Sequence, residues 1–144
     1  MRYAKNQHDR THRRITQRAA AMLRERGIAQ TGIAGLMAAS GLTNGAFYAH
    51  FASKEALVAE TLRDLADHPG RFTEALESGM PPERWLRLYL SPEHRDHPEA
   101  GCAAAPLAAE IARHPAATRQ AFAAMTGRAL AAMRSEEHTS ELQS

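Results

Sequence analysis

The chain has 144 residues, of which 44% are hydrophobic and 24% charged, and its formal net charge is +2. These values are ordinary for a soluble globular protein and allow one medium domain or two small ones. They exclude a membrane-spanning chain, because the longest low-charge run, residues 100–109, is far shorter than the roughly 20 apolar residues that a transmembrane helix needs.

The chain begins with a basic segment. We expect residues 1–8 to form a flexible arm that can reach phosphates or a minor groove, and a first helix to start at Asp9 or Thr11 and to stop at Gly27. A helix dipole disfavours cations at its N-terminus, so a negatively charged partner would explain the arginines there; a solvated basic helix is the alternative. These arginines are Arg10, Arg13, Arg14 and Arg18.

Residues 33–42 predict a short helix and a tight turn. Ile33, Leu36 and Met37 form one apolar face of a helix that is too short to be stable without packing. Gly41 can adopt the positive φ that ends a helix, and Leu42 returns an apolar side chain to the core.

A second short helix begins directly after this turn, with Thr43 as a suitable N-cap. In α-helical geometry Asn44 and Tyr48 share one face, while Phe47 points about 100° away from Asn44. Two helices joined by a glycine turn form the helix-turn-helix arrangement, whose second helix enters the DNA major groove. Similar turns also occur in all-helical cores that touch no DNA.

The distribution of charge favours nucleic-acid binding. Residues 1–54 carry nine Lys and Arg against two acidic residues, a net charge of +7. Residues 55–144 carry nine Arg against fourteen acidic residues, a net charge of −5. A basic segment joined to an acidic one is typical of a nucleic-acid-binding domain fused to another domain.

Residues 41–57 resemble the signature of the tetracycline-repressor (TetR) family of bacterial transcriptional regulators. The resemblance is most specific at residues 47–51, Phe-Tyr-Ala-His-Phe, and at residues 53–55, Ser-Lys-Glu. The resemblance implies a helix-turn-helix domain in residues 1–70 and a partial helical effector-binding and dimerisation domain in residues 71–133. It implies a ligand-responsive repressor of the cytoplasm that binds a palindromic operator on double-stranded DNA as a homodimer.

Seven residues are expected to contact DNA. A cation such as Lys54 in the first turn of a helix opposes the dipole unless an anion such as a phosphate approaches. Gly45 allows close approach of the backbone, and Tyr48 can reach a phosphate or a base; for His50, a purely structural role at the helix end is the alternative. The expected contacts are Thr31, Thr43, Asn44, Gly45, Tyr48, His50 and Lys54.

The rest of the chain predicts further helices and no strands, hence an all-α fold. Ser53 is an N-cap for a helix that runs to about His68, and shorter helices follow at residues 71–78 and around Trp85. A polar loop, residues 91–102, precedes two helices at residues 103–113 and 116–133. An effector pocket would be lined by some of the large or soft side chains, which are otherwise simply core: Trp85, Tyr89, Cys102, Leu107, Phe122 and Met125.

No constellation for metal binding or catalysis stands out. His94, His97 and Cys102 lack the second ligand pair of a strong zinc signal, and His8 and His12 lack a third ligand. We therefore expect no metal, no cofactor and no catalytic residue; an all-helical metal-dependent or enzymatic module is the alternative. The single cysteine cannot form an internal disulfide, which fits a reducing cytoplasm.

The last segment, residues 134–144, continues no apolar stripe and resembles the translation of a sequencing-adaptor oligonucleotide. We expect it to be a non-native tail on a C-terminally truncated reading frame. A truncated fragment that binds DNA only non-specifically is therefore the alternative to a specific dimeric repressor.

Overall fold

The computed structural model describes residues 1–141, including the side chains of residue 1 and of residues 4–135. Throughout this range the regular elements are helices, which confirms the expected all-α fold. They are α1 (Arg2–Arg26), α2 (Ile33–Ala39), η1 (Asn44–Ala49), α3 (Lys54–Asp67), α4 (Arg71–Glu77), α5 (Pro82–Tyr89), α6 (Pro92–Asp96), η2 (Pro98–Ala100), α7 (Ala104–Ile111) and α8 (Ala116–Glu141).

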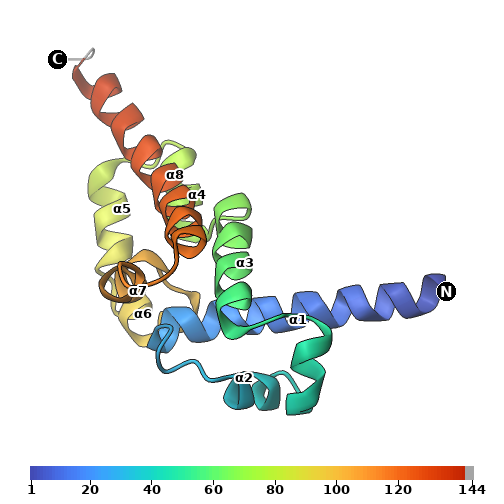
Figure 1. The fold of residues 1–144 in the computed structure, drawn as a ribbon. Coiled ribbons are helices and arrows are strands. Elements are labelled where there is room, and N and C mark those ends of the chain that lie inside the picture. The colour runs from blue at the N-terminus through green and yellow to red at the C-terminus, as the bar shows by residue number, and fades with distance from the viewer. Residues whose placement is uncertain (142–144) are drawn as a thin grey trace.

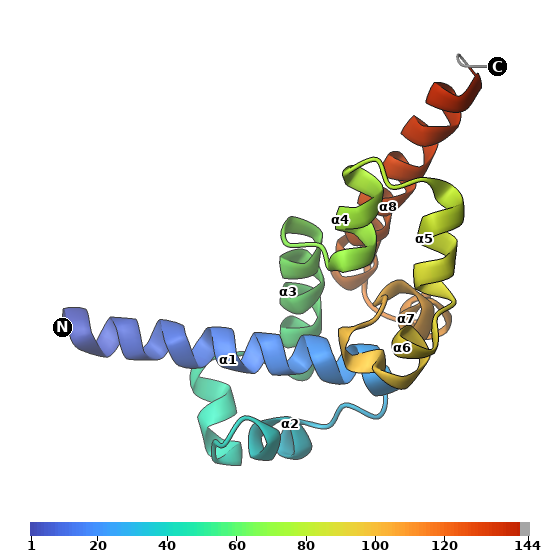
Figure 2. The same ribbon diagram turned by 180° about the vertical axis from the view of Figure 1, so that it is seen from behind.

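Helix α1 crosses the molecule and separates two groups of helices. Helices α2 and η1 lie on one side of it, whereas α3, α4, α5 and α8 rise on the other (Figure 1). The view from behind shows the same division, with the N-terminal half of α1 projecting beyond the rest (Figure 2). None of the helices in the described range has both the length and the hydrophobicity needed to cross a membrane.

Two buried clusters form the core, and both α1 and α3 contribute to each. The first cluster contains Ile15, Ala19, Met22, Leu36, Met37, Phe47, Phe51 and Leu57. The second contains Ala20, Leu23, Ile28, Val58, Leu62, Leu65, Ala103, Leu107, Ile111 and Ala121. Successive residues of an α-helix point about 100° apart, so neighbours along α1 serve different clusters.

The turn after α2 has the predicted geometry. Gly41 has a φ of +67°, and Leu42 N–H donates to the Met37 carbonyl at 2.9 Å. Met37 is completely buried, so the short helix is held by packing as expected.

The second short helix differs from the prediction. It is a 3₁₀ helix, and the side chain of Thr43, although at the N-cap position, makes no capping hydrogen bond. The helix has six residues, one of them Gly45, and it ends where Phe47 and Phe51 enter the core. Such a short segment follows its packing more than its α-helical propensity.

Three other boundaries differ from the prediction. Helix α1 starts at Arg2, so the expected flexible arm is helical; this segment holds good helix formers and no Gly or Pro. Residues 91–102 are not a plain loop, because Ser91 caps α6 and Pro92 occupies its first turn. Helix α8 does not stop at Met133 but continues to Glu141, and residues 134–141 contain no Gly or Pro that would end it; residues 142–144 of the expected tail lie outside the described residues.

Two carboxylates fasten the C-terminal helices α7 and α8 to earlier parts of the chain. Glu55, in the first turn of α3 as predicted, accepts a hydrogen bond from the Thr118 hydroxyl and lies 3.0 Å from His114 Nδ1. Glu110 of α7 accepts the backbone N–H groups of Ile28 and Ala29 at 3.2 and 2.8 Å. Each carboxylate therefore satisfies donors of a segment distant in sequence.

We predict that Gly27→Ala lowers the free energy of unfolding by about 1–3 kcal/mol. Gly27 has a φ of +77°, and a Cβ there would overlap Glu110 Oε1, which holds the following backbone. Gly35→Ala is the matched control: it lies inside α2 with open space around it, so it should raise stability by about 0.5–1 kcal/mol. Urea unfolding of both variants measures the two changes in stability. Equal changes would contradict the requirement for glycine at position 27.

Candidate functional site

The 3₁₀ helix η1 presents a polar face to solvent. Its outer face consists of Thr43, Asn44, Gly45 and Tyr48, all exposed, with 66% of Tyr48 accessible. Phe47 points the other way and is fully buried in the first cluster. The 3₁₀ helix thus has the predicted buried face on one side and solvent-exposed face on the other.

The other three expected contacts are less exposed. Thr31 is only 3% exposed and its hydroxyl donates to the Gly27 carbonyl at 2.7 Å, which contradicts the expected DNA contact for this side chain. Lys54 is half-buried at the first position of α3, beside Ser53, whose hydroxyl oxygen accepts Ala56 N–H at 3.0 Å. His50, just after η1, is also half-buried.

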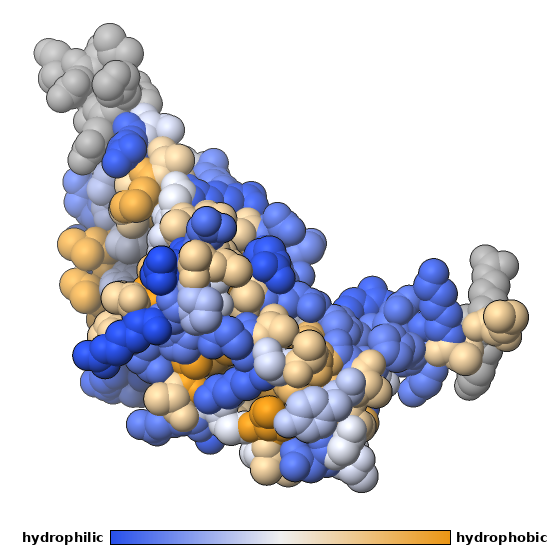
Figure 3. Space-filling model, in the orientation of Figure 1, coloured by the Kyte–Doolittle hydropathy of each residue, from blue (hydrophilic) through white to orange (hydrophobic). Residues whose placement is uncertain are grey.

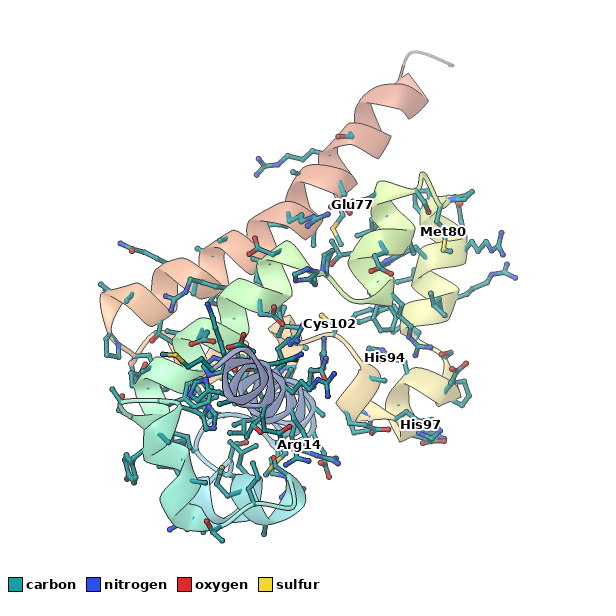
Figure 4. The ribbon with its side chains drawn as sticks, turned by 90° about the vertical axis from the view of Figure 1, so that its right-hand side faces the viewer. Arg14, Glu77, Met80, His94, His97 and Cys102 are labelled. Carbon is teal, nitrogen blue, oxygen red and sulfur yellow. The ribbon has the colours of Figure 1, made fainter. Side chains whose placement is uncertain are left out.

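A basic face runs along the exposed side of α1. Its four arginines are exposed, and within the described part of the chain they form no ion pair or side-chain hydrogen bond: Arg10, Arg13, Arg14 and Arg18. Figure 4, which looks along α1, shows Arg14 at the surface of this helix. Unpaired arginines on one helix can interact with a polyanion without first breaking internal ion pairs.

A histidine cluster joins α1 to the end of η1. The rings of His8 and His50 stack with centroids 4.3 Å apart, and His8 Nε2 lies 3.2 Å from the Ala49 carbonyl oxygen. His12 stacks on Phe51 and contacts the Glu60 carboxylate. Burial lowers the pKa of His50, and the nearby His8 and His12 lower it further. The four-residue spacing of His8 and His12 indicates that both lie on one face of the helix. The spacing does not indicate that this face packs against His50.

A second feature is a small cavity of about 60 Å³ among α1, the α3–α4 turn, the segment before α7, and α8. Of the six expected pocket residues, Cys102 and Met125 line it. Leu107 is fully buried in the second cluster, and Phe122 packs against that cluster. Arg24, which the sequence did not single out, is the charged residue among those that line the cavity.

The two remaining pocket candidates belong to an aromatic cluster beside the cavity. Trp85 and Tyr89 stack with centroids 4.9 Å apart, and Trp85 Nε1 donates to the Phe72 carbonyl at 2.9 Å. Burial raises the pKa of Tyr89, and the nearby Cys102 raises it further. Tyr89 therefore lies close to Cys102, which lines the cavity.

The residues considered for a zinc site do not converge. His94 lies next to Cys102, whereas His97 lies farther out (Figure 4). His94 Nε2 accepts the Cys102 backbone N–H at 3.1 Å, so its proton is on Nδ1, which donates to the Tyr89 carbonyl at 2.6 Å. Among the described residues no group of three or more potential ligands could hold a metal ion.

The family model described as "Bacterial regulatory proteins, tetR family" matches residues 15–67, which run from the middle of α1 to the end of α3. Over these residues the chain therefore matches the TetR family. The whole outer face of η1 falls within the matched range.

The curated relatives that this chain resembles are named as HTH-type transcriptional repressors. The HTH-type transcriptional repressor KstR2 of Mycolicibacterium smegmatis is 34% identical over 87 residues, which are 56% of this chain and 42% of that protein. KstR2 of Rhodococcus jostii is 38% identical over 63 residues, 43% of this chain and 31% of that protein. The chain thus spans less than half the length of these curated relatives.

Solved structures share the fold well beyond the matched domain. E. coli NemR in its reduced form has a TM-score of 0.69 at 23% identity, covering 92% of this chain and 72% of that one. A TetR-family regulator from Agrobacterium tumefaciens gives 0.69 at 22% identity, covering 92% and 74%. The helices after α3 therefore also follow this fold.

We predict that the TetR-family domain loses stability on acidification. A depressed pKa means that folded His50 binds a proton less readily than the unfolded chain does, so its contribution to stability is present above the unfolded pKa of about 6.5 and is lost as the pH falls from there through the lower pKa of the folded state. Asp9 and Glu60 are the carboxylates that contact this cluster, at His8 and His12 respectively.

Thermal unfolding between pH 7.5 and 5.5 measures the effect. His50→Gln should flatten the dependence of the melting temperature on pH, whereas His97→Gln, at a side chain 62% exposed, should leave it unchanged. If the melting temperature of the His50 variant depends on pH as steeply as that of the wild type, the acid sensitivity comes from other groups.

Proposed function

We propose that this chain is a DNA-binding transcriptional repressor in which the α2–η1 unit sits in the major groove and η1 reads the bases. The observation that carries the proposal is the outer face of η1, held outward by the buried Phe47. Asn44 supplies an amide that can pair with an adenine edge, and the Tyr48 hydroxyl can reach a base or a phosphate. Thr43, whose hydroxyl makes no cap, is free for a phosphate.

Phosphate contacts position this element in the proposal. Lys54 and the free amides at the start of α3 suit one phosphate, and the four arginines of α1 suit the neighbouring backbone. His50 is a weaker candidate for such a contact, because its ring stacks on His8.

The complete protein, in our proposal, is a homodimer on a palindromic operator and is released by a small-molecule effector. Two η1 helices read half-sites about one DNA turn apart only if an interface holds them at that spacing. Exposed apolar side chains on α5 and α8 support such an interface: Leu86, Leu90 and Leu130 are 51%, 71% and 51% accessible. Figure 3 shows apolar surface over α5 and along α8.

We predict that Gly45→Ala weakens DNA binding without changing stability. A Cβ at position 45 meets no protein atom within 4 Å, so the fold tolerates it, but the methyl group would occupy the space that an approaching DNA backbone or base needs. Fluorescence anisotropy with DNA flanking the native gene and a melting curve measure the two effects. Undiminished affinity would remove position 45 from the interface.

Lys54→Ala should weaken binding to all DNA sequences alike and reduce the slope of log K against log salt by about one unit, as the loss of one phosphate contact does. Arg84→Ala is the control, because Arg84 is exposed on α5, away from η1. Titrations from low to moderate salt give both slopes. An unchanged slope in the Lys54 variant would contradict the phosphate contact.

A further inference from the structure

Arg24, in the last turn of α1, is a cation without an anion. Its Nε is buried and has no hydrogen-bond partner, and the described residues provide no ion pair for it. Burial lowers the pKa of Arg24, and the Cys102 sulfur is the group that acts against this shift. Because a partly desolvated charge without a counter-charge is unfavourable, this position favours an anionic partner.

The chain's own carboxylates near α1 are engaged elsewhere. Glu25, the next residue, pairs with Arg26 at 3.0 Å. Glu110 accepts the amides of Ile28 and Ala29. Glu93, near the start of α4, pairs with Arg71 at 2.9 Å. These carboxylates therefore leave Arg24 without a counter-charge from the described residues.

The cavity beside Arg24 limits the size and polarity of that anion. Its volume of about 60 Å³ leaves room for roughly four to six non-hydrogen atoms. Apart from Arg24, its walls are mostly apolar, with Leu65, Phe72 and Met125 as the largest side chains. One positive charge at the end of an apolar space suits a singly charged head with a short hydrocarbon tail, and suits a doubly charged phosphate poorly.

We propose that this cavity binds a short-chain monocarboxylate, with its carboxylate on the Arg24 guanidinium and its alkyl chain between Phe72 and Met125. The proposal rests on the repressor function proposed above in naming this ligand as the effector. Arg24 ends the helix that supports η1, while Phe72 and Met125 belong to α4 and α8. A ligand that contacts α1 through Arg24 and also α4 and α8 can couple its binding to the position of α1 relative to those two helices.

Thermal unfolding with sodium propionate and sodium butyrate, at constant ionic strength and without DNA, tests the site directly. Propionamide and butyramide are the neutral isosteres. Each carboxylate should raise the melting temperature by about 3–5 °C at ten times its Kd, and the amides should not. Absence of a shift with both carboxylates, or an equal shift with the amides, would overturn the proposal.

Three variants locate the effect. Arg24→Met should abolish the carboxylate shift while melting at or above the wild-type temperature, because it removes an unpaired buried charge. Arg26→Met, at an exposed position of the same turn, should keep the shift. Ala129→Leu narrows the cavity with Arg24 intact and should also abolish the shift. A wild-type shift in the Arg24 variant would overturn the assignment, and because no DNA is present, that failure is distinct from a failure of the proposed repressor function.

Discussion

The architecture depends on two apolar faces carried by one helix. Neighbouring residues of α1, such as Ala19 and Ala20 or Met22 and Leu23, pack into different clusters. The first cluster supports α2 and η1, and the second supports α7 and α8. Because a helix is stiff over this length, a displacement of α1 against one cluster must disturb the other. The position of η1 and the packing of the C-terminal helices are thus mechanically connected without any flexible hinge between them.

Polar contacts reinforce this connection at both ends of the packed region. Glu55 ties the start of α3 to α8, and Glu110 ties α7 to the backbone just after α1. Both carboxylates are satisfied, whereas the buried Nε of Arg24 has no hydrogen-bond partner. Arg24 lines the cavity among α1, α4 and α8, so an unpaired charge lies where the N-terminal helix meets the later helices.

The sequence predicted those features whose causes are local. Gly27 and Gly41 end helices through positive φ, and Ser53 caps α3, as their residue types indicated. Features that depend on distant packing were missed. The 3₁₀ form of η1 and the burial of Thr31 follow from contacts across the core, and Arg24 reads in the sequence as one more surface arginine. Ser91 and Pro92 are local signals for the start of α6, although a loop was expected there.

The contact between Glu110 and the turn at Gly27 links two distant positions of the chain. The carboxylate fills the space where any other residue at position 27 would place its Cβ, and it satisfies the amides that the turn exposes. A larger residue at 27 is compatible with the fold only if residue 110 withdraws, and withdrawal leaves the two amides unsatisfied. The two positions are therefore physically coupled, and the effect of a side chain introduced at position 27 depends on which residue occupies position 110.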